Sequence, residues 1–268
     1  MKIKKTKQLQ TLSNLNTSAS LTAQYKKEMD KLLKEMRKSV DYFLLRSYQK
    51  NEDAIVQDSA FSSINEQFDK LYKRWFKIYD RFAERFAPNF IRKVTHDTRT
   101  RITKEFHKSG FKISRFANNR HYTNVANALV TENVNLIKTI ASQYLDNVQG
   151  IVMRGITLGH DVKFIQKELK KRYAITERRA NFIASDQTHK ATQAIQRTCD
   201  QQLGITQGIW VHRAGSKSSR LTHQEMNGKT FDLTKGLYDS DVKREVLPAE
   251  LYGCRCTYHR ILPELLRK

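Results

Sequence analysis

The sequence has few of the residues that interrupt regular structure. Its 268 residues include only 3 Pro and 10 Gly, so long helices are expected. The 3 Cys, an odd number, do not make a disulfide framework and indicate folding in a reducing compartment. No apolar run approaches the roughly 18 residues that a membrane span needs, and the polar N-terminus lacks the apolar core of a secretion signal. We therefore expect no membrane association and no export by a cleaved signal.

Standard catalytic motifs are also missing. The chain has no GxxxxGK[ST] phosphate loop and no GxGxxG, GxSxG or HExxH motif. Its carboxylates are scattered, so a two-metal nuclease centre would have to be assembled from distant residues. These absences argue against an enzyme.

Positive charge is what the sequence has in excess. It carries 49 Lys and Arg against 27 Asp and Glu, a net charge of +22, and the excess is spread along the chain. Basicity of this kind attracts polyanions mainly through phosphate contacts that carry no sequence information. Nucleic acid bound without sequence specificity is the predicted partner, and a solvated basic surface or an acidic protein partner is the alternative.

Apolar spacing divides the chain into three parts. Residues 1–17 show no sustained period and predict a flexible basic arm, whereas residues 18–173 predict a helical domain. The clearest signal is a heptad-like stripe that runs into Pro88 and consists of Phe61, Ile64, Phe68, Leu71, Trp75, Ile78, Phe82 and Phe86. A separate short helix over 161–173 is predicted to end the helical domain. Within residues 174–268 we predict a helix from Thr176 to about Leu203, followed by short strands over 207–211 and 254–262. The predicted fold class is α+β, with long helices in the N-terminal two thirds and a small mixed C-terminal module holding a short antiparallel sheet.

A basic stretch follows Pro88. From Arg85 to Tyr122 there are ten Lys and Arg against two acidic residues, interleaved with Phe. This pattern suits either a phosphate-facing surface or a helix whose Lys and Arg stems cover apolar neighbours. The predicted DNA-binding residues are Arg92, Lys93, Arg99, Arg101, Lys104, Lys108, Lys112, Arg115 and Arg120.

Thiol and imidazole groups gather near the C-terminus. Cys254, Cys256 and His259, with His212 or His223, are the ligand types of a tetrahedral zinc site. However, CxC is shorter than the usual CxxC spacing, and strand alternation places both thiols on one face, where they can simply pack. We therefore expect reduced structural cysteines and no cofactor, with zinc at His223, Cys254, Cys256 and His259, or a CxC disulfide, as alternatives.

An ordered set of short motifs resembles the phage Mu F-like minor head protein family of tailed phages. The set consists of Arg179-Ala180-Asn181-Phe182-Ile183-Ala184-Ser185-Asp186-Gln187-Thr188-His189-Lys190, Gly204-Ile205, Trp210, Arg220-Leu221-Thr222-His223, Asn227-Gly228-Lys229-Thr230-Phe231, Pro248 and Gly253-Cys254-Arg255-Cys256. The chain departs from the family pattern at Ser216-Lys217-Ser218-Ser219, where an acidic run is common, and at Gly253, where Asn is common.

This resemblance implies a non-catalytic virion component that is present in few copies. Such proteins associate with the portal protein and with major capsid or scaffolding protein, and act in head morphogenesis, genome packaging or ejection. The implied location is the capsid interior near the portal, and the host cytoplasm during assembly.

Eight of the motif positions are expected to have structural roles: Trp210, Arg220, His223, Gly228, Phe231, Cys254, Arg255 and Cys256. Trp210 and Phe231 predict a small core, Gly228 follows Asn227 in a tight-turn signal, and Arg220 with His223 is expected to brace that turn. Two other functions compete with a minor capsid protein. One is a metal-dependent nuclease or toxin-like enzyme that uses His223 and the Cys254, Cys256 and His259 cluster, and the other is a sequence-nonspecific nucleic-acid-binding protein.

Overall fold

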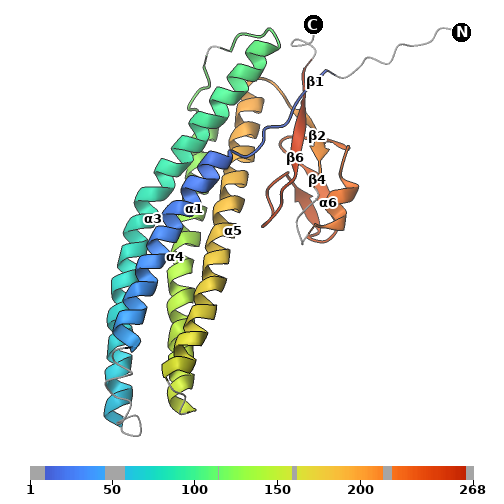
Figure 1. The fold of residues 1–268 in the computed structure, drawn as a ribbon. Helices are drawn as coiled ribbons and strands as arrows, with labels where there is room; N and C mark the ends of the chain where they lie inside the picture. The colour runs from blue at the N-terminus through green and yellow to red at the C-terminus, as the bar shows by residue number, and fades with distance from the viewer. Residues whose placement is uncertain (1–9, 46–57, 114, 159–161, 214–218, 264–268) are drawn as a thin grey trace, which may run out of the picture. The chain divides into compact units, whose positions relative to one another are not determined.

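The structure is a computed structural model that describes residues 10–45, 58–113, 115–158, 162–213 and 219–263 (Figure 1). In chain order its elements are β1 (Thr11–Leu12), α1 (Ala19–Val40), the π-helical turn η1 (Asp41–Leu45), α3 (Asp58–Lys108), α4 (Arg120–Thr157), α5 (Val162–Gln202), β2 (Gln207–Val211), α6 (Leu221–Glu225), β3 (Thr230–Asp232), β4 (Leu237–Asp239), β5 (Arg244–Val246) and β6 (Thr257–Ile261). The predicted α+β class is confirmed. In the described part of the chain, no helix combines the length and apolar character needed to cross a bilayer.

The chain forms two compact units that do not follow chain order. One contains residues 22–90 and 130–185, and the other contains residues 1–21, 91–129 and 186–268. We call the first the helical unit and the second the sheet unit. The predicted division into residues 18–173 and 174–268 stays a prediction, although its boundary falls inside the continuous helix α5.

The helical unit is built from segments of α1, α3, α4 and α5, which run alongside one another (Figure 1). Tyr25 lies at its centre. Its ring meets Phe86 and Phe90 edge-on with centroids 4.8 Å away in each case, and its hydroxyl donates to Asn133 Oδ1 at 3.1 Å. Aromatic packing and one satisfied polar pair therefore hold three helices together.

The predicted aromatic stripe is only partly the buried face of α3. At its N-terminal end, the stripe residues Phe68, Leu71 and Trp75 are buried. Further along α3, the stripe residues Ile78, Phe82 and Phe86 are only half-buried, and the buried positions are instead Tyr79, Ala83 and Ala87. A 3.5-residue period drifts around a helix with 3.6 residues per turn, so the buried face leaves the heptad positions.

Pro88 does not end α3, which continues to Lys108. Its ring is exposed, and the side chain of Asn89 donates to the Arg85 carbonyl at 2.9 Å in the same turn. The predicted break near Tyr173 in α5 is likewise absent. Thr176 does not cap a new helix, because its hydroxyl donates to the Arg172 carbonyl at 3.1 Å within a continuing helix.

The sheet unit contains an antiparallel sheet of order β1-β6-β2-β3 and a separate β4-β5 hairpin. The register sets Trp210 of β2 opposite Tyr258 of β6 and Gly208 opposite Arg260. Trp210, Phe231 and Tyr258 pack edge to face at 5.7 and 5.8 Å between successive centroids. A Cβ at Gly208 would lie 2.8 Å from Tyr258 Cδ2, too close for a real contact, so glycine allows this close packing.

Residues 10–17 differ from the predicted flexible arm. They include β1, which pairs with β6, and the Asn14 side chain donates to Thr257 Oγ1 at 2.7 Å. Leu15 is buried, and the Gln10 carbonyl accepts the Leu262 N–H at 3.0 Å. Backbone pairing with an otherwise open sheet edge orders this segment; residues 1–9 lie outside the described residues.

A buried polar network lies against β6 in the sheet unit. The Tyr258 hydroxyl donates to Asp200 Oδ2 at 2.6 Å, and Arg260, fully buried, lies 3.8 Å from the same carboxylate and also pairs with Glu105. Burial raises the pKa of Asp200 to about 6, against the lowering effect of Arg260.

We predict that Asp200 contributes stability at acidic pH. Because its pKa is raised in the folded state, the folded protein holds this proton more tightly than the unfolded chain does. The contribution is present below about pH 4 and is lost as pH rises through about 6, a change of about 3 kcal/mol in the free energy of unfolding. Chemical denaturation at several pH values measures the free energy of unfolding of wild type and of Asp200→Asn. The wild-type value minus the Asp200→Asn value should fall as pH rises from about 4 to above about 6. A difference that is constant with pH would contradict the prediction.

Candidate functional site

The C-terminal half of α5 carries polar side chains that are buried. In the sheet unit, Asp186, Gln187, Thr188, His189, Thr192, Gln193, Gln196, Thr198 and Asp200 are all buried. Buried polar groups require partners. For two of them, the partner is the backbone of the segment Gly253-Cys254-Arg255-Cys256, which we call the cysteine loop.

Asp186 and His189 hold the two ends of the cysteine loop. Asp186 Oδ1 accepts the Gly253 N–H at 2.8 Å, and His189 Nε2 lies 3.1 Å from the Cys256 carbonyl oxygen. Since a carbonyl only accepts, Nε2 of His189 carries a proton, and Nδ1 accepts from the Thr17 hydroxyl at 2.7 Å. Burial lowers the pKa of His189, which favours this neutral form.

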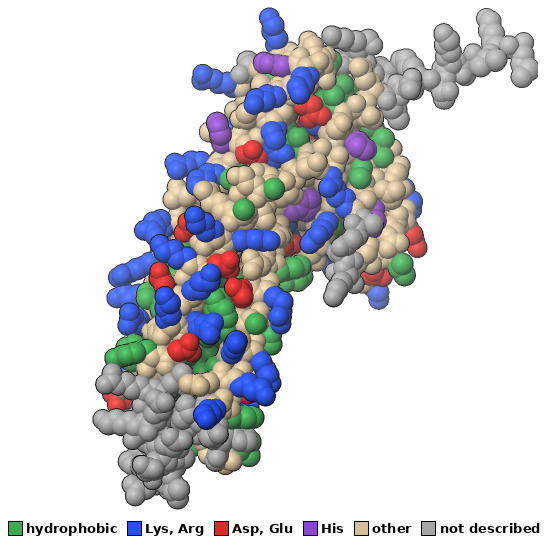
Figure 2. Space-filling model, in the orientation of Figure 1, with side chains coloured by type: hydrophobic (Ala, Val, Ile, Leu, Met, Phe, Trp, Pro, Cys, Tyr) green, Lys and Arg blue, Asp and Glu red, His purple; other side chains and the backbone are tan. Residues whose placement is uncertain are grey.

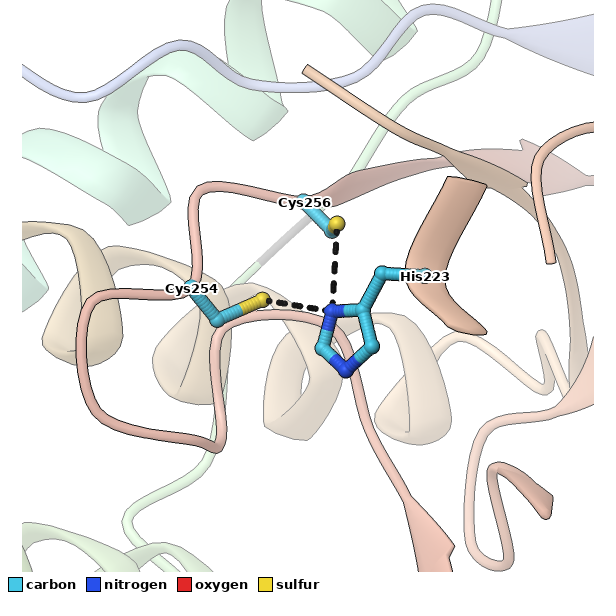
Figure 3. Close-up of side chains that lie close together, drawn as sticks. All are labelled: His223, Cys254 and Cys256. Carbon is cyan, nitrogen blue, oxygen red and sulfur yellow. Dashed lines mark hydrogen bonds between the residues drawn. The ribbon is translucent and has the colours of Figure 1, made fainter. Parts of the chain in front are cut away.

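The cysteine loop directs two thiols toward one imidazole. Nδ1 of His223 lies 3.4 Å from Cys254 Sγ and 3.6 Å from Cys256 Sγ (Figure 3). Their side-chain ligand atoms all lie within 4.8 Å of one another, and the three residues are 2 to 4% exposed. Among the described residues, these three side chains form a group of His, Cys, Asp or Glu whose ligand atoms lie close enough together to hold a metal ion. We call it the thiol–imidazole cluster.

A buried carboxylate fixes the imidazole of this cluster. His223 lies on α6, and its Nε2 is 3.0 Å from Asp239 Oδ2 at the end of β4. Burial works against the charged imidazole, but Cys254 and Asp239 together raise the pKa of His223. Burial also works against the charged Asp239, yet the Asp241 N–H and His223 hold the pKa of Asp239 below its usual value.

The two thiols are not equivalent. The S–H of Cys256, with His223, lowers the pKa of Cys254 to about 4, despite the opposing effect of burial. The Cys254 sulfur and burial raise the pKa of Cys256. Cys254 is therefore the more acidic thiol of the pair.

A second histidine approaches the cluster. His212, half-buried at the end of β2, has Nδ1 3.5 Å from Cys256 Sγ and Nε2 3.0 Å from the Ser219 hydroxyl. His259, which the sequence offers as a zinc ligand, lies in β6 opposite Ile209 and is not part of the cluster.

The remaining motif positions support the module around the cluster. Trp210 is fully buried, with its ring 5.4 Å from that of His223, and Arg255 is exposed. Gly228 has φ +79°, and its N–H donates to the Trp210 carbonyl at 2.8 Å. Contrary to the prediction from the sequence, Arg220 and His223 do not brace the turn at Gly228. Arg220 donates to the Tyr252 carbonyl at 3.2 Å, next to the cysteine loop, and His223 contacts Asp239 and the two thiols.

The nine predicted DNA-binding residues fall into two groups. Seven are exposed, namely Arg92, Lys93, Lys104, Lys108, Lys112, Arg115 and Arg120. The other two are half-buried and have structural contacts: Arg99 lies 4.3 Å from the ring centre of Tyr122 and donates to Asn118, and Arg101 pairs with Asp97 at 2.7 Å.

Two open hollows flank Arg92 and His96. The larger, of about 630 Å³, is also lined by Arg99, Lys104 and Arg115, and the smaller, of about 510 Å³, includes Lys93. We call this surface the basic hollows. Figure 2 shows that Lys and Arg side chains outnumber Asp and Glu over the visible face.

Comparison with known proteins agrees with the motifs of the C-terminal region. Residues 146–259 match the family model described as "Phage Mu protein F like protein". Residues 146–259 form a phage Mu F-like region. This match confirms, over these residues, the resemblance predicted from the sequence.

A curated relative extends the similarity beyond the phage Mu F-like region. A protein from Haemophilus influenzae (strain ATCC 51907 / DSM 11121 / KW20 / Rd), described as uncharacterized, is 27% identical over 244 residues, which cover 89% of this chain and 52% of the relative. The chain therefore spans about half the length of this relative. No solved structure matches the chain.

Several residues of the site were not predicted from the sequence. Asp186 and His189 belong to one of the phage Mu F-like motifs, but the motif gives no sign that they bind the cysteine loop. Asp239 has no motif at all, and it reaches His223 only because the β4-β5 hairpin brings it there.

We predict that Asp186→Ala destabilises the sheet unit by about 1 to 3 kcal/mol, because it leaves the half-buried Gly253 N–H without its acceptor. Asp186→Asn, which keeps an acceptor oxygen, should cost less. Chemical denaturation and hydrogen exchange at Gly253 measure these effects. Asp69→Ala, at an exposed carboxylate of α3, is the control; equal destabilisation by Asp69→Ala and Asp186→Ala would contradict the assigned role.

Proposed function

We propose that this chain is a minor capsid protein that acts in head morphogenesis of a tailed phage. The observation that carries the proposal is the phage Mu F-like match over residues 146–259. The proposed partners are the portal protein and the major capsid or scaffolding protein. The proposed location is the capsid interior near the portal, after assembly in the host cytoplasm.

The buried site supports a structural role for the module. Asp186 and His189 hold the cysteine loop, and Asp239 holds His223. The side chains of the thiol–imidazole cluster are therefore fixed by contacts inside the protein. His223, Cys254 and Cys256 are buried, whereas an enzyme must expose its reacting groups to substrate. A preformed shape that docks on other head proteins is consistent with this arrangement.

Packaged double-stranded DNA is the proposed ligand of the basic hollows. The two acidic residues of this stretch are used in ion pairs inside the sheet unit, Asp97 with Arg101 and Glu105 with Arg260. The exposed Lys and Arg around the hollows therefore give a positive surface suited to phosphate contacts. Such contacts are sequence-independent and would serve packaging or ejection.

The DNA proposal predicts affinity that is independent of sequence and falls steeply with salt. Titration of duplex DNA from about 50 to about 300 mM salt should give a linear decrease of log K with log salt. The variant Arg92→Gln/Lys104→Gln/Arg115→Gln/Arg120→Gln should reduce the slope by about 1 for each phosphate that the variant no longer binds.

The matched control removes the same charge from exposed positions of the helical unit. It is Lys73→Gln/Lys77→Gln/Arg81→Gln/Arg85→Gln on α3. If both quadruple variants change the slope equally, the basic hollows have no special part in binding. Salt-independent affinity, or preference for one sequence, would contradict DNA binding of this kind altogether.

Assembly with head proteins distinguishes the proposal from a free nucleic-acid-binding protein. Co-expression with the portal, major capsid and scaffolding proteins of the same phage, followed by nuclease treatment and size-exclusion chromatography, should yield a complex that survives removal of DNA. Loss of every such complex after nuclease treatment would support a nucleic-acid-binding protein instead.

A further inference from the structure

The thiol–imidazole cluster has the dimensions of a tetrahedral metal site. With Zn–S bonds of about 2.3 Å and Zn–N bonds of about 2.0 to 2.1 Å, tetrahedral geometry places a ligating N and S about 3.6 Å apart. The distances from His223 Nδ1 to Cys254 Sγ and Cys256 Sγ are 3.4 and 3.6 Å. Both sulfur atoms point toward the same nitrogen, so the space bounded by the three atoms is where an ion would lie (Figure 3).

The surroundings of the cluster resemble the second layer of contacts around a metal. A ligating histidine usually donates its other N–H to a carboxylate, which fixes the ring and leaves the ligating nitrogen unprotonated. Asp239 Oδ2, at 3.0 Å from Nε2 of His223, supplies this contact from a fully buried position. The cluster therefore has His223 oriented with Nδ1 toward the thiols.

His212 is the candidate for a fourth ligand. His212 Nδ1 lies 3.5 Å from Cys256 Sγ, again the separation of two ligands on one ion, and its Nε2 meets the Ser219 hydroxyl at 3.0 Å. His212 lies outside the group of three, so its half-buried side chain must rotate toward His223 and Cys254 to complete a Cys₂His₂ set, which is typical of structural zinc sites.

We infer that His223, Cys254 and Cys256, with His212 as the fourth ligand, bind one Zn²⁺ ion. Thiolate and imidazole together select zinc over the harder Mg²⁺ and Ca²⁺. Both sulfurs bind as thiolates, so any proton that they still carry passes to solvent, and no oxidation is involved. The ion joins α6 and the end of β2 to the cysteine loop, so it would act as an internal cross-link of the sheet unit.

Metal analysis of the full chain tests this inference. Protein purified without chelator and with added zinc, then passed through a desalting column, should retain about one Zn²⁺ per chain by elemental mass spectrometry. Cys254→Ser and Cys256→Ser should each reduce retained zinc at least about tenfold, and Asp239→Asn should weaken zinc affinity by about 10- to 100-fold. Cys199→Ser and His259→Gln are the matched controls, because both residues lie outside the cluster, and they should keep the metal.

Cobalt substitution of the wild type keeps the inference testable if a variant fails to fold. Co²⁺ at the site should give intense thiolate-to-cobalt absorption and the visible bands of a tetrahedral centre, and stoichiometric zinc should displace them. The inference is overturned if wild-type protein retains no stoichiometric zinc and shows no such bands. Equal loss of metal in Cys199→Ser and Cys254→Ser would also overturn it.

Discussion

The contacts between the polar face of α5 and the backbone of the cysteine loop are the constraint on which the sheet unit depends. A helix buried on several sides cannot leave carboxylate and imidazole groups unpaired. Asp186 and His189 meet this requirement by binding the Gly253 N–H and the Cys256 carbonyl. One helical turn therefore fixes both ends of the loop, and the two thiols between them acquire a defined direction.

The rest of the site follows from this anchoring. With the cysteine loop fixed, Cys254 and Cys256 both face His223, whose ring is held in turn by Asp239. Further along the same helix, Asp200 accepts the Tyr258 hydroxyl and so fixes β6 beside it. Buried polar contacts thus organise this part of the sheet unit, alongside the apolar core around Trp210, Phe231 and Tyr258. This suits a small region that must present one fixed shape to neighbouring proteins in an assembled particle.

The sequence predicts the fold class and the motif order well, because both depend on local signals. Helical spacing, the strands around Trp210 and Tyr258, and the turn at Gly228 are set by neighbouring residues. Continuity through Pro88 and Thr176 could not be predicted, since it depends on whether the rest of the helix tolerates a missing hydrogen bond or a hydroxyl. The partnership of Asp239 with His223, and the replacement of His259 by His212 beside Cys256, depend on tertiary contacts that no spacing encodes.

A structural protein of the phage head must be found in the particle, whatever its contacts with metal or DNA. The most direct measurement is therefore quantitative mass spectrometry of purified phage particles that carry the gene, after nuclease and protease treatment of the intact surface. Peptides of this chain should be present at a fixed, low ratio to the portal and be protected from external protease. Particles that contain portal and capsid proteins but no peptide of this chain would contradict the proposed function.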